Sequence, residues 1–336
     1  MHKREKYKKI LIVGYGNIAV RHIQNIKKLM PNCEIKVLRQ FSKEPVFKNS
    51  AIKQTIFKME EAIKWKPDIA FITSPAPLHL DAAISFAELG SHLYIEKPLS
   101  SNLVGIMELQ EKVLSKNIVL MVGYNLRYNK ALQALKKAML NNILGEIYSV
   151  KAEVGQWLPS WRPAKDYRKT VTARKELGGG AILELSHDID YLRFIFGEVS
   201  TVTCLASKQS NLDINVEDNA EILLQFHNGI MANLHLDLLR YDVTRTCTVL
   251  GEKGTLILDL ISCNLRMFSS ETNEWTDLYN NQLYDSNQTY LDCLTNLIES
   301  IKNNKTTFIP ISQGIKTLKV ALAAKESNLE KKTVYL

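Results

Sequence analysis

The sequence lacks any apolar run long enough to cross a bilayer. Its apolar runs, such as NIVLMV at residues 117–122, fall far short of the ~20 residues that a membrane-spanning helix needs. The charged N-terminal segment MHKREKYKK is followed by a short strand-like run and not by the apolar core of a signal peptide. We therefore expect no membrane span and no secretory signal, and we expect a cytoplasmic protein.

The sequence is also poor in cysteine, and its few cysteines are scattered. No CxxC pair occurs among them, which argues against a zinc site and against the disulfide framework of a secreted domain. No cluster of His, Asp and Glu has the spacing of metal ligands, and the nucleophile-elbow, Walker and zincin motifs are absent. We predict a reducing compartment and no metal. The five cysteines are Cys33, Cys204, Cys247, Cys263 and Cys293.

A basic stripe interleaved with aromatic residues is missing too, although the formal net charge is +8. The segment from Met1 to Lys9 holds five Lys or Arg residues and one Glu, so it accounts for half of this excess. A charge run at a terminus is typical of a solvated tail. We therefore expect no nucleic-acid partner.

With 336 residues the chain exceeds the ~250–300 residues at which single cores stop growing, so two domains are expected. Over residues 1–124, short apolar strands alternate with helical segments. Strands that are apolar nearly throughout, joined by helices, predict a parallel sheet covered on both faces. The predicted strands are KKILIVG, EIKVLRQ, DIAFITS, SHLYIE and IVLMVGYN.

Beyond about residue 145 the pattern changes to strand-like segments with period-two alternation, joined by turns such as HNG and GEKG. One long helix is expected from about Gly180 to Phe196, and ISQGIKTLKVALAAKESNLEKK reads as a closing amphipathic helix. Residues 125–336 are therefore predicted to form an α+β domain with a mostly antiparallel open sheet, closing helix included.

The loop between the first predicted strand and helix has the pattern Gly14-x-Gly16-x-x-Ala19. Gly14 permits the tight turn, Gly16 lets a pyrophosphate approach the backbone, and Ala19 allows close packing of helix on strand. Asn17 and Ile18 would open the helix, whose N-terminus favours negative charge. The pattern predicts a dinucleotide site, and a plain strand–helix turn is the alternative.

The ends of the second and third strands refine this prediction. Arg39, with Ser42 close by, stands where an NAD-binding site usually has an acidic residue, and a cation there favours a 2′-phosphate. We predict NADP(H) as the preferred cofactor, with NAD(H) as the alternative. Thr73, Ser74 and Pro75 end the third strand, where ligands of open parallel sheets bind, and we expect them to line the cofactor.

The fourth strand ends in Glu96-Lys97-Pro98. One reading is an ordinary surface lysine before a proline. The other is an active-site cation that leaves a buried strand into a cleft, with its direction fixed by Pro98 and its ammonium suited to proton transfer.

The stretch GGGAILELSHDID, residues 178–190, places three glycines before the long predicted helix. Glu184, His187 and Asp190 step by three along one face of it, so that His187 can take or give a hydroxyl proton and a carboxylate one turn away can orient its ring. The alternative is a surface helix with ordinary polar residues. The apolar stripe expected to face the core is Ile182, Leu185, Ile189, Leu192 and Phe196.

Taken together, these motifs resemble the Gfo/Idh/MocA family of glucose–fructose oxidoreductases and inositol dehydrogenases. The resemblance extends over nearly the whole chain, in one order, through GYGNIAVRH, TSPAPLH, EKP, GYNLRYNKAL, LGEIYSV, GGGAILELSHDIDYLRFIFGE and ALAAKES. It implies a Rossmann domain over residues 1–124 that binds NAD(P), and a substrate-binding and oligomerisation domain over 125–336. It also implies hydride transfer to or from a sugar, cyclitol or nucleotide-sugar.

The resemblance implies roles for particular residues. Lys97 would be the catalytic lysine and His187 the second catalytic residue, with Glu96 and His79 beside the cofactor. Asn125 and Arg127 would lie near the nicotinamide, and Arg127 would also reach the substrate. The residues expected to line the substrate pocket, by likeness to a subgroup from bacterial surface-sugar gene clusters, are Trp161, Arg162, Tyr167 and Arg168.

One departure from the family pattern affects the acid beside His187. Much of the family has Asp-x-x-x-His, whereas this chain has Glu184-x-x-His187, so the roles of Glu184, Asp188 and Asp190 stay open. His22 and His79 are expected to pack beside the cofactor in a structural role.

Three functions remain in competition. The leading prediction is an NAD(P)-dependent oxidoreductase acting on CH–OH groups of a sugar or nucleotide-sugar. The alternatives are a cyclitol dehydrogenase and a non-catalytic dinucleotide-binding regulator on the same fold. Because an open sheet with one uncovered face favours pairing, we expect a homodimer or homotetramer.

Overall fold

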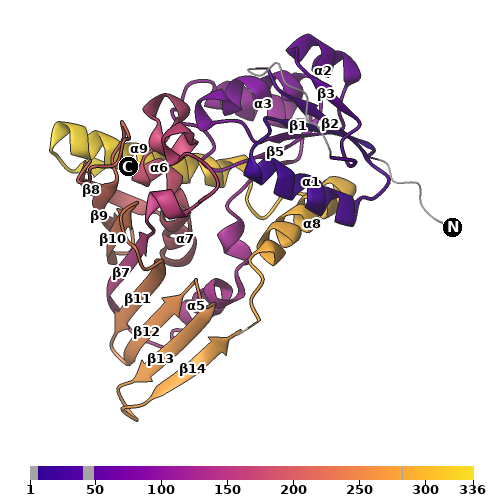
Figure 1. Ribbon diagram of the computed structural model, residues 1–336. Helices are drawn as coiled ribbons and strands as arrows, with labels where there is room; N and C mark the ends of the chain where they lie inside the picture. Colours follow the sequence, from indigo (N-terminus) through magenta and orange to yellow (C-terminus); the bar gives the residue numbers. More distant parts are fainter. Residues whose placement is uncertain (1–6, 41–48, 282) are drawn as a thin grey trace. The chain divides into compact units, whose positions relative to one another are not determined.

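The computed structural model describes residues 7–40, 49–281 and 283–336, and the chain divides into two compact units (Figure 1). The first unit comprises Met1–Tyr124 and Tyr290–Ile315, and the second comprises Asn125–Thr289 and Lys316–Leu336. The division after residue 124 coincides with the boundary expected from the sequence. Residues 290–315, in contrast, return to the first unit and are not part of the second.

The first unit is built on a parallel sheet whose strands lie in the order β3-β2-β1-β4-β5-β6. The central strands β1 and β4 are buried almost throughout, as expected for strands covered on both faces. β3 is the one strand of this sheet that the apolar pattern did not predict. The strands are β1 (Lys9–Val13), β2 (Glu34–Leu38), β3 (Gln54–Ile56), β4 (Ile69–Ile72), β5 (His92–Ile95) and β6 (Leu120–Val122).

The helices of the first unit follow the strands, except for the one that arrives from the end of the chain. α1 buries Ala19, Ile23 and Ile26 at helical spacing, which fixes its inner face on the sheet. α8 begins near residue 287 and buries Cys293, and its apolar positions explain why this segment joins the first core. The helices are α1 (Asn17–Leu29), α2 (Met59–Trp65), α3 (His79–Glu88), α4 (Ile106–Ser115) and α8 (Asn287–Asn303).

The second unit contains a nine-stranded sheet in the order β14-β13-β12-β11-β7-β10-β9-β8-β15. All neighbouring strands are antiparallel except β7 and β10, which are parallel, so the predicted mostly antiparallel sheet is confirmed. The strands are β7 (Ile147–Gly155), β8 (Val199–Ser207), β9 (Asn219–Phe226), β10 (Met231–Asp237), β11 (Thr244–Gly251), β12 (Gly254–Asp259), β13 (Asn264–Ser269), β14 (Trp275–Asn280) and β15 (Val334–Tyr335).

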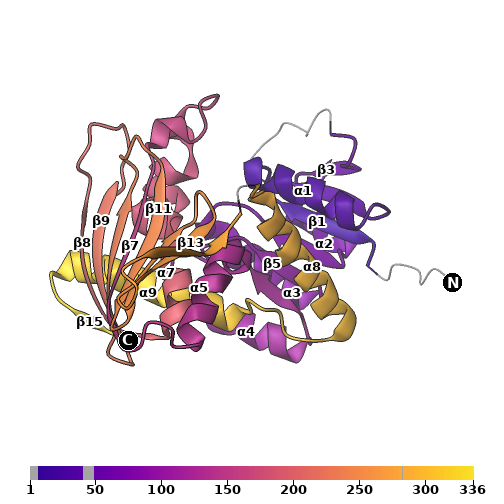
Figure 2. The same cartoon turned by 90° about the horizontal axis from the view of Figure 1, so that it is seen from below.

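One face of this sheet is covered by helices (Figure 2). α5 contacts β12, β13 and β14, while α7 contacts β7. On the other face the side chains alternate outward, as in β9, where Glu221, Leu223 and Gln225 are exposed between buried neighbours. The helices are α5 (Lys130–Leu140), α6 (Ala181–Glu184), α7 (Ser186–Phe196) and α9 (Ile311–Glu330).

The single helix predicted from Gly180 to Phe196 is divided into α6 and α7. The division lies at Leu185, whose ψ of 19° leaves the helical range, so that this residue ends one helix and precedes the next. The predicted apolar stripe is nevertheless buried at all five positions: Ile182, Leu185, Ile189, Leu192 and Phe196.

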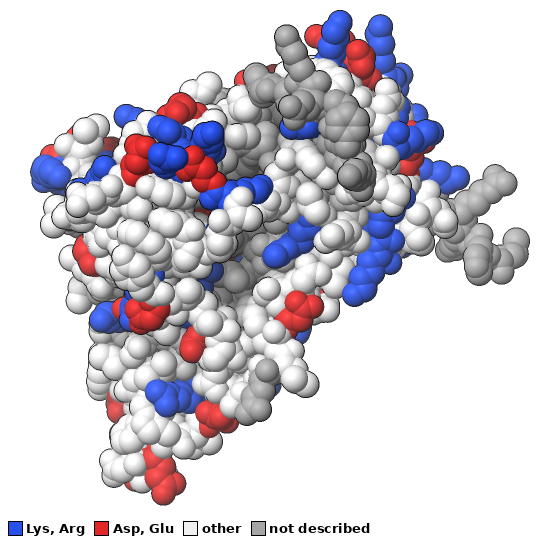
Figure 3. All heavy atoms as spheres, in the orientation of Figure 1, with Lys and Arg blue, Asp and Glu red and all other residues white. Residues whose placement is uncertain are grey.

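In the described part of the chain, no helix is both long enough and apolar enough to cross a membrane. On the face shown in Figure 3, acidic and basic side chains of the described residues are interspersed and do not form a stripe of one sign.

Candidate functional site

The glycine loop lies where the carboxyl ends of β1, β2 and β4 meet. The backbone N–H of Gly14 donates to the carbonyl of Leu38 at 2.9 Å, and the Thr73 hydroxyl donates to the carbonyl of Val13 at 2.9 Å. Gly14 has φ +91°, and a Cβ at this position would lie 2.9 Å from the backbone nitrogen of Ser74. Only glycine fits this turn without strain.

The N-terminus of α1 is open toward a ligand. Gly16 precedes the helix without a capping side-chain hydrogen bond, no acidic residue lies in the first turn, and no heavy atom lies within 4 Å of a Cβ built on Gly16. Asn17 and Ile18 begin the helix, and Ala19 is fully buried. Nearby, the Ser74 hydroxyl oxygen is buried and has no hydrogen-bond partner among the described residues. An unfilled space at a helix N-terminus beside an unpartnered hydroxyl fits a dinucleotide pyrophosphate.

Arg39 directly follows β2. Its backbone N–H donates to the carbonyl of Ile56, and its guanidinium lies 6.0 Å from the centre of the Tyr15 ring in the glycine loop. This contact holds a cation at the end of the second strand, where the ribose of a bound dinucleotide would lie. Ser42, the other residue predicted here, lies outside the described residues, and the preference for NADP(H) stays a prediction.

Lys97 is half-buried at the end of β5, and its backbone is anchored by its neighbour. The Lys97 N–H donates to Glu96 Oε2 at 3.2 Å, and Glu96 Oε1 lies 2.6 Å from Nε2 of His22, on α1. Glu96 and His22 are both buried, with 8% and 1% of their surface exposed. The peptide bond between Lys97 and Pro98 is cis.

His79 contacts the same segment from the other side. Its Nδ1 lies 3.0 Å from the carbonyl oxygen of Pro98, and its Nε2 lies 2.7 Å from the carbonyl oxygen of Ser74. Both carbonyls favour a protonated ring, but burial is the larger effect and lowers the pKa of His79. His79 and Glu96 are thus engaged with the chain itself, and their predicted contact with a cofactor stays a prediction.

The three polar residues of the predicted helix differ in their exposure to solvent. Glu184 and His187 are half-buried, whereas Asp190 is 1% exposed. The interruption at Leu185 separates Glu184, in α6, from His187 and Asp190, which both belong to α7. Within α7, Asp190 lies on a buried side and His187 on a partly exposed one.

Asp190 is held in a buried ion pair. It accepts hydrogen bonds from Nε and Nη2 of Arg127, at 2.7 and 2.8 Å, and from the Thr317 hydroxyl at 2.8 Å. The two charged side chains are only 3% and 2% exposed. Because each of these buried charges has the other as its partner, we interpret the pair as structural. The predicted contacts of Arg127 and Asp190 with cofactor or substrate stay predictions. The hydrogen bonds between the two side chains do not favour such contacts, because they already occupy both carboxylate oxygens of Asp190 and the Nε and Nη2 atoms of Arg127.

Asp188 is fully buried, with no exposed surface. Its Oδ2 lies 3.0 Å from Nη2 of Arg245 on β11. Burial, together with the nearby Asp188 carboxylate, raises the pKa of the Cys247 thiol to about 12. Burial, together with Cys247 and Asp188, holds the pKa of Tyr191 well above its usual value. Of the three acids left open by the sequence, Glu184 is therefore the partly exposed one.

Two of the three glycines before α6 are explained by contacts within the second unit. A Cβ on Gly179 would lie 2.3 Å from the carbonyl oxygen of Val171, and one on Gly180 would lie 2.4 Å from the carboxylate of Glu217. Gly180 also has φ +102°, a conformation that other residues rarely adopt. The groups that these two glycines approach closely are the chain's own backbone and Glu217.

Asn125 and Arg127 lie in the short 3₁₀ segment Asn125–Tyr128. Asn125 is 4% exposed, and its side-chain amide donates to the Thr289 hydroxyl at 2.6 Å. Both predicted residues are thus buried and hydrogen-bonded within their own unit.

The loop that follows β7 carries the predicted substrate residues. The indole N–H of Trp161 donates to the carbonyl of Gln156 at 2.9 Å, and the Tyr167 hydroxyl accepts from a backbone N–H. Arg168 is paired with Asp166 through two hydrogen bonds of 2.8 and 2.9 Å. The exposed Arg162 side chain has no polar partner among the described residues.

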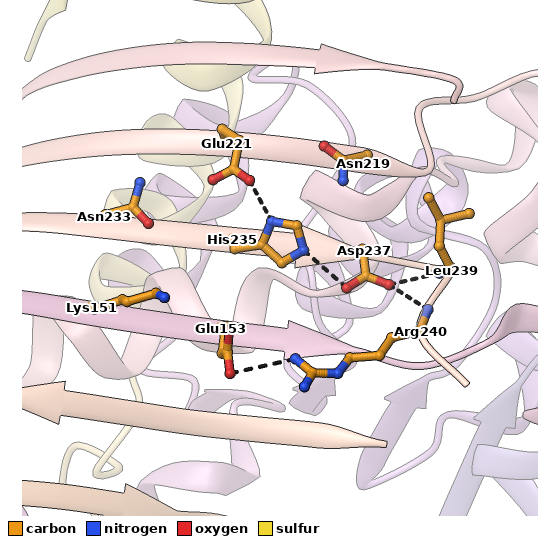
Figure 4. A pocket seen from close by; sticks show the side chains of 9 residues that line it. All are labelled: Lys151, Glu153, Asn219, Glu221, Asn233, His235, Asp237, Leu239 and Arg240. Atoms are coloured by element: carbon orange, nitrogen blue, oxygen red, sulfur yellow. Dashed lines mark hydrogen bonds and ion pairs between the residues drawn. The ribbon is translucent and has the colours of Figure 1, made fainter. Parts of the chain in front are cut away.

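A second cluster of charged groups lies on the uncovered sheet face, in a cavity of about 450 Å³ (Figure 4). His235 Nδ1 lies 2.6 Å from Glu221 and Nε2 lies 3.0 Å from Asp237. The hydrogen bond to Asp237, opposed by burial, raises the pKa of His235 to about 9. The other lining residues are Lys151, Glu153, Asn219, Asn233, Leu239 and Arg240.

Sequence reasoning missed this cluster, because period-two alternation shows which side chains share a face but not which of them meet across strands. It also missed the contact between His22 and Glu96. Within the described residues, no group of three or more His, Cys, Asp or Glu side chains is placed to hold a metal ion.

A glycine turn and an open helix N-terminus at the carboxyl ends of parallel strands, in the order found for the first unit, define a dinucleotide-binding Rossmann domain. Residues 8–124 match the model of the oxidoreductase family with an NAD-binding Rossmann fold, and residues 136–336 match that of the same family's C-terminal alpha/beta domain. The chain therefore belongs to the Gfo/Idh/MocA oxidoreductase family, as its motifs predicted.

Several relatives and solved structures are similar to this chain over nearly its whole length. Myo-inositol 2-dehydrogenase of Thermotoga maritima is 25% identical, covering 98% of each chain. The uncharacterized oxidoreductase YrbE of Bacillus subtilis is 28% identical, covering 94% of this chain and 93% of its own. A levoglucosan dehydrogenase in complex with NADH superposes with a TM-score of 0.85 at 18% identity, covering 98% of both chains.

The WlbA dehydrogenase of Bordetella pertussis, in complex with NADH and UDP-GlcNAcA, superposes with a TM-score of 0.81 at 22% identity, covering 98% of this chain and 99% of that one. At these identities the two structures show a common fold.

Proposed function

We propose that the protein is an NAD(P)-dependent oxidoreductase that transfers a hydride between the nicotinamide and a hydroxyl or keto carbon of a sugar or nucleotide-sugar. The observation that carries the proposal is the open N-terminus of α1 beside the unpartnered Ser74 hydroxyl, at the strand ends that also bear Lys97. Membership of an oxidoreductase family supports it.

The cofactor, when bound, supplies or accepts the hydride. The chain's own residues bind the pyrophosphate, through the N–H groups at the start of α1 and the Ser74 hydroxyl. Lys97 polarises the substrate oxygen by a hydrogen bond or shares its proton with His187. His187 takes the hydroxyl proton during oxidation and returns it during reduction. Glu184, one turn before it and partly exposed, orients the imidazole. Arg127 and Asp190 would act as positioning residues, because their ion pair joins the 3₁₀ segment Asn125–Tyr128 to α7, which carries His187.

Arg39 supports a preference for NADP(H). A guanidinium held by the Tyr15 ring can pair with a 2′-phosphate, whereas the ribose hydroxyl of NAD(H) is ordinarily bound by an acidic residue. NAD(H) remains the alternative, and the relatives solved with NADH favour it.

The loop after β7 supports a substrate that carries negative charge. Arg162 is exposed and has no polar partner among the described residues, whereas Arg168 is already paired with Asp166. We therefore place Arg162 first among the four predicted substrate residues, with Trp161 and Tyr167 as apolar and hydroxyl contacts. A nucleotide-sugar, as named for the WlbA complex, has the phosphates that such an arginine would bind.

The second candidate is a cyclitol dehydrogenase, which the full-length similarity to myo-inositol 2-dehydrogenase favours. A non-catalytic regulator on the same fold would bind the dinucleotide and turn nothing over. The three functions separate in one experiment series.

The first experiment is a titration of the wild type and of Arg39→Asp with NADPH and NADH, followed by nicotinamide fluorescence. Micromolar NADPH binding that weakens by roughly tenfold or more in the variant supports the cofactor site and the role of Arg39, because one lost ion pair to phosphate is worth at least ~1.4 kcal/mol. Absence of binding by either cofactor refutes the oxidoreductase proposal.

Nucleotide-sugars, neutral sugars and cyclitols are then screened for turnover. Lys97→Ala and His187→Ala should each lower kcat by about 10²–10⁴, the usual contribution of general acid–base groups. Turnover that survives both substitutions would remove these residues from the mechanism, and cofactor binding without any turnover would favour the regulator.

We also propose that the protein is cytoplasmic and forms a homodimer or homotetramer. All five cysteines are buried and unbridged, which supports a reducing compartment. The uncovered sheet face carries Leu205, Leu223 and Met231, each more than half exposed, which supports self-association. Gel filtration with light scattering would refute the oligomer by showing a monomer at micromolar concentration.

A further inference from the structure

Two buried histidines contact the residues on either side of Lys97. Before it, Glu96 lies 2.6 Å from Nε2 of His22, which belongs to α1. After it, the carbonyl oxygen of Pro98 lies 3.0 Å from Nδ1 of His79, at the start of α3. All of these residues belong to the first unit.

The contact with His22 continues to the backbone of Lys97. Glu96 uses Oε1 toward His22 and accepts the Lys97 N–H with Oε2, so one carboxylate bridges α1 and Lys97. His22 is 1% exposed, and its ring lies 4.8 Å from that of Tyr94 and 5.5 Å from that of Phe71. In such surroundings a charged hydrogen bond is strong and its geometry is restricted.

Two other titratable groups that face Glu96, Tyr290 and Cys293, have raised pKa values and stay neutral near pH 7. Burial, together with the Glu96 carboxylate, raises the pKa of Tyr290 to about 12 and holds the pKa of the Cys293 thiol well above its usual value. The Arg21 guanidinium is directed at the Tyr290 ring, 4.7 Å from its centre. His22 is therefore the titratable partner that the described structure places at hydrogen-bond distance from this carboxylate.

The contact with His79 ends at the other cofactor segment. Its Nε2 lies 2.7 Å from the carbonyl of Ser74, the residue whose hydroxyl has no partner. The backbone before Lys97 is thus joined to α1, and the backbone after it is joined to the loop that follows β4. These are the two segments that would hold the dinucleotide.

We propose that His22 and His79 are positioning residues, which fix the backbone of Lys97 relative to the two dinucleotide-binding segments. The inference rests on the proposed function, because Lys97 needs a fixed place only if it acts on a substrate beside the cofactor. Its importance follows from geometry, since a reacting group displaced by about 1 Å can lose roughly 100-fold in rate.

The first test measures how firmly the contact between His22 and Glu96 holds the backbone of Lys97, and it requires no cofactor. Hydrogen exchange of the Lys97 amide, which donates to Glu96, is followed in the full chain for the wild type, His22→Leu and His22→Gln. We expect exchange to accelerate roughly tenfold or more in His22→Leu, and less in His22→Gln, which keeps a side-chain donor. The matched control is His92→Gln, at the other end of β5, where the ring accepts the Val119 N–H at 3.1 Å.

The second test measures the consequence at the cofactor. Bound NADH should keep its Kd within about threefold in His22→Leu and in His79→Gln, because the pyrophosphate contacts remain. Its emission should shift toward that of free NADH, because the segment around Lys97 no longer holds a fixed place beside the nicotinamide.

The outcomes separate the two proposals. Failure of the wild type to bind NADH or NADPH defeats the proposed function, while the exchange measurement still decides whether His22 holds the backbone of Lys97. Unchanged Lys97 exchange in folded His22→Leu overturns the inference, and so does a loss of NADH affinity with no change in emission. If His22→Leu does not fold, His22→Gln and His79→Gln carry the comparison, and wild-type rates in both would equally overturn it.

Discussion

The substitution Asp190→Asn removes one charge from a buried pair and changes almost no volume. Asp190 accepts three hydrogen bonds: two from the Arg127 guanidinium, at 2.7 and 2.8 Å, and one from Thr317 at 2.8 Å. The side-chain oxygen of an asparagine can keep the bonds that Asp190 Oδ1 accepts from Arg127 Nη2 and from Thr317. Its NH₂ group would replace Oδ2 and face the Nε–H of Arg127, so that two donors would meet. Arg127, 3% exposed, would then be a buried charge without its counter-charge.

The expected loss of stability follows from these contacts. One hydrogen bond to a charged group is worth about 1.5–3 kcal/mol, and a buried donor left without a partner costs about 1–3 kcal/mol. The sum agrees with the roughly 3–5 kcal/mol measured when one partner of a buried ion pair is removed. Against a total of about 5–15 kcal/mol for a typical domain, this is enough to leave the second unit marginal.

The assay is urea unfolding followed by circular dichroism, analysed for the transition of the second unit. Asp190→Asn should lower its free energy of unfolding by about 3–5 kcal/mol. The double variant Asp190→Asn/Arg127→Met should be less destabilised than the two single changes added together, because the stranded charge is gone. The control is Asp242→Asn, whose partner Arg240 lies on an exposed loop and whose loss should cost no more than about 1 kcal/mol.

The reasoning is refuted if Asp190→Asn unfolds within about 1 kcal/mol of the wild type. If the variant is stable but has lost turnover, the original hypothesis that Asp190 takes part in catalysis would regain support. If the double variant regains stability but not turnover, the positioning role of the pair is supported.

Two further predictions concern other parts of the chain. The pKa of His235 is raised from 6.5 to about 9, so its contribution to stability is complete below pH 6.5 and is lost as the pH rises through 9. Discounted for the partial exposure of the ring, this contribution is about 1–2 kcal/mol of unfolding free energy. His235→Gln should therefore remove the decrease of the unfolding free energy with pH across that interval. Gly14→Ala should destabilise the first unit by about 1–3 kcal/mol, because φ is +91° and the added Cβ meets the backbone of Ser74. Gly16→Ala, with open space around it, should leave the melting temperature unchanged and weaken NADPH binding, and a stable Gly14→Ala would contradict the account of the turn.

Much of the fold could be predicted because the apolar pattern of each segment agrees with the place of that segment in the folded unit. The five predicted strands of the first sheet consist mostly of buried apolar residues, and the apolar stripe from Ile182 to Phe196 is buried as expected. Elements with weaker patterns were missed, among them the three-residue β3 and α8, whose polar start obscures its apolar face. The return of residues 290–315 to the first unit could not be foreseen, because it depends on a surface that exists only after folding.

The candidate site was predictable where residue type and strand position decide chemistry. Gly14, Gly16 and Lys97 occupy the strand ends at which their motifs placed them. Spacing alone could not show that Asp190 is occupied by Arg127, because that partner lies 63 residues away. Nor could it show that Glu96 meets His22, 74 residues before it.

The edge of the first sheet has a consequence for how the protein is made. β6 is the last strand of that sheet, and its partners come from the far end of the chain: the Val122 N–H donates to the carbonyl of Ile309 at 2.9 Å, and the Thr307 hydroxyl donates to the carbonyl of Leu120 at 2.8 Å. The last of these pairs spans 187 residues, which a ribosome adds in roughly 10–40 s.

Throughout that interval the nascent first unit presents an uncovered strand edge, the kind of surface on which unfinished chains pair with one another. The protein should therefore be most vulnerable to aggregation during translation, before residues 307–309 have reached β6.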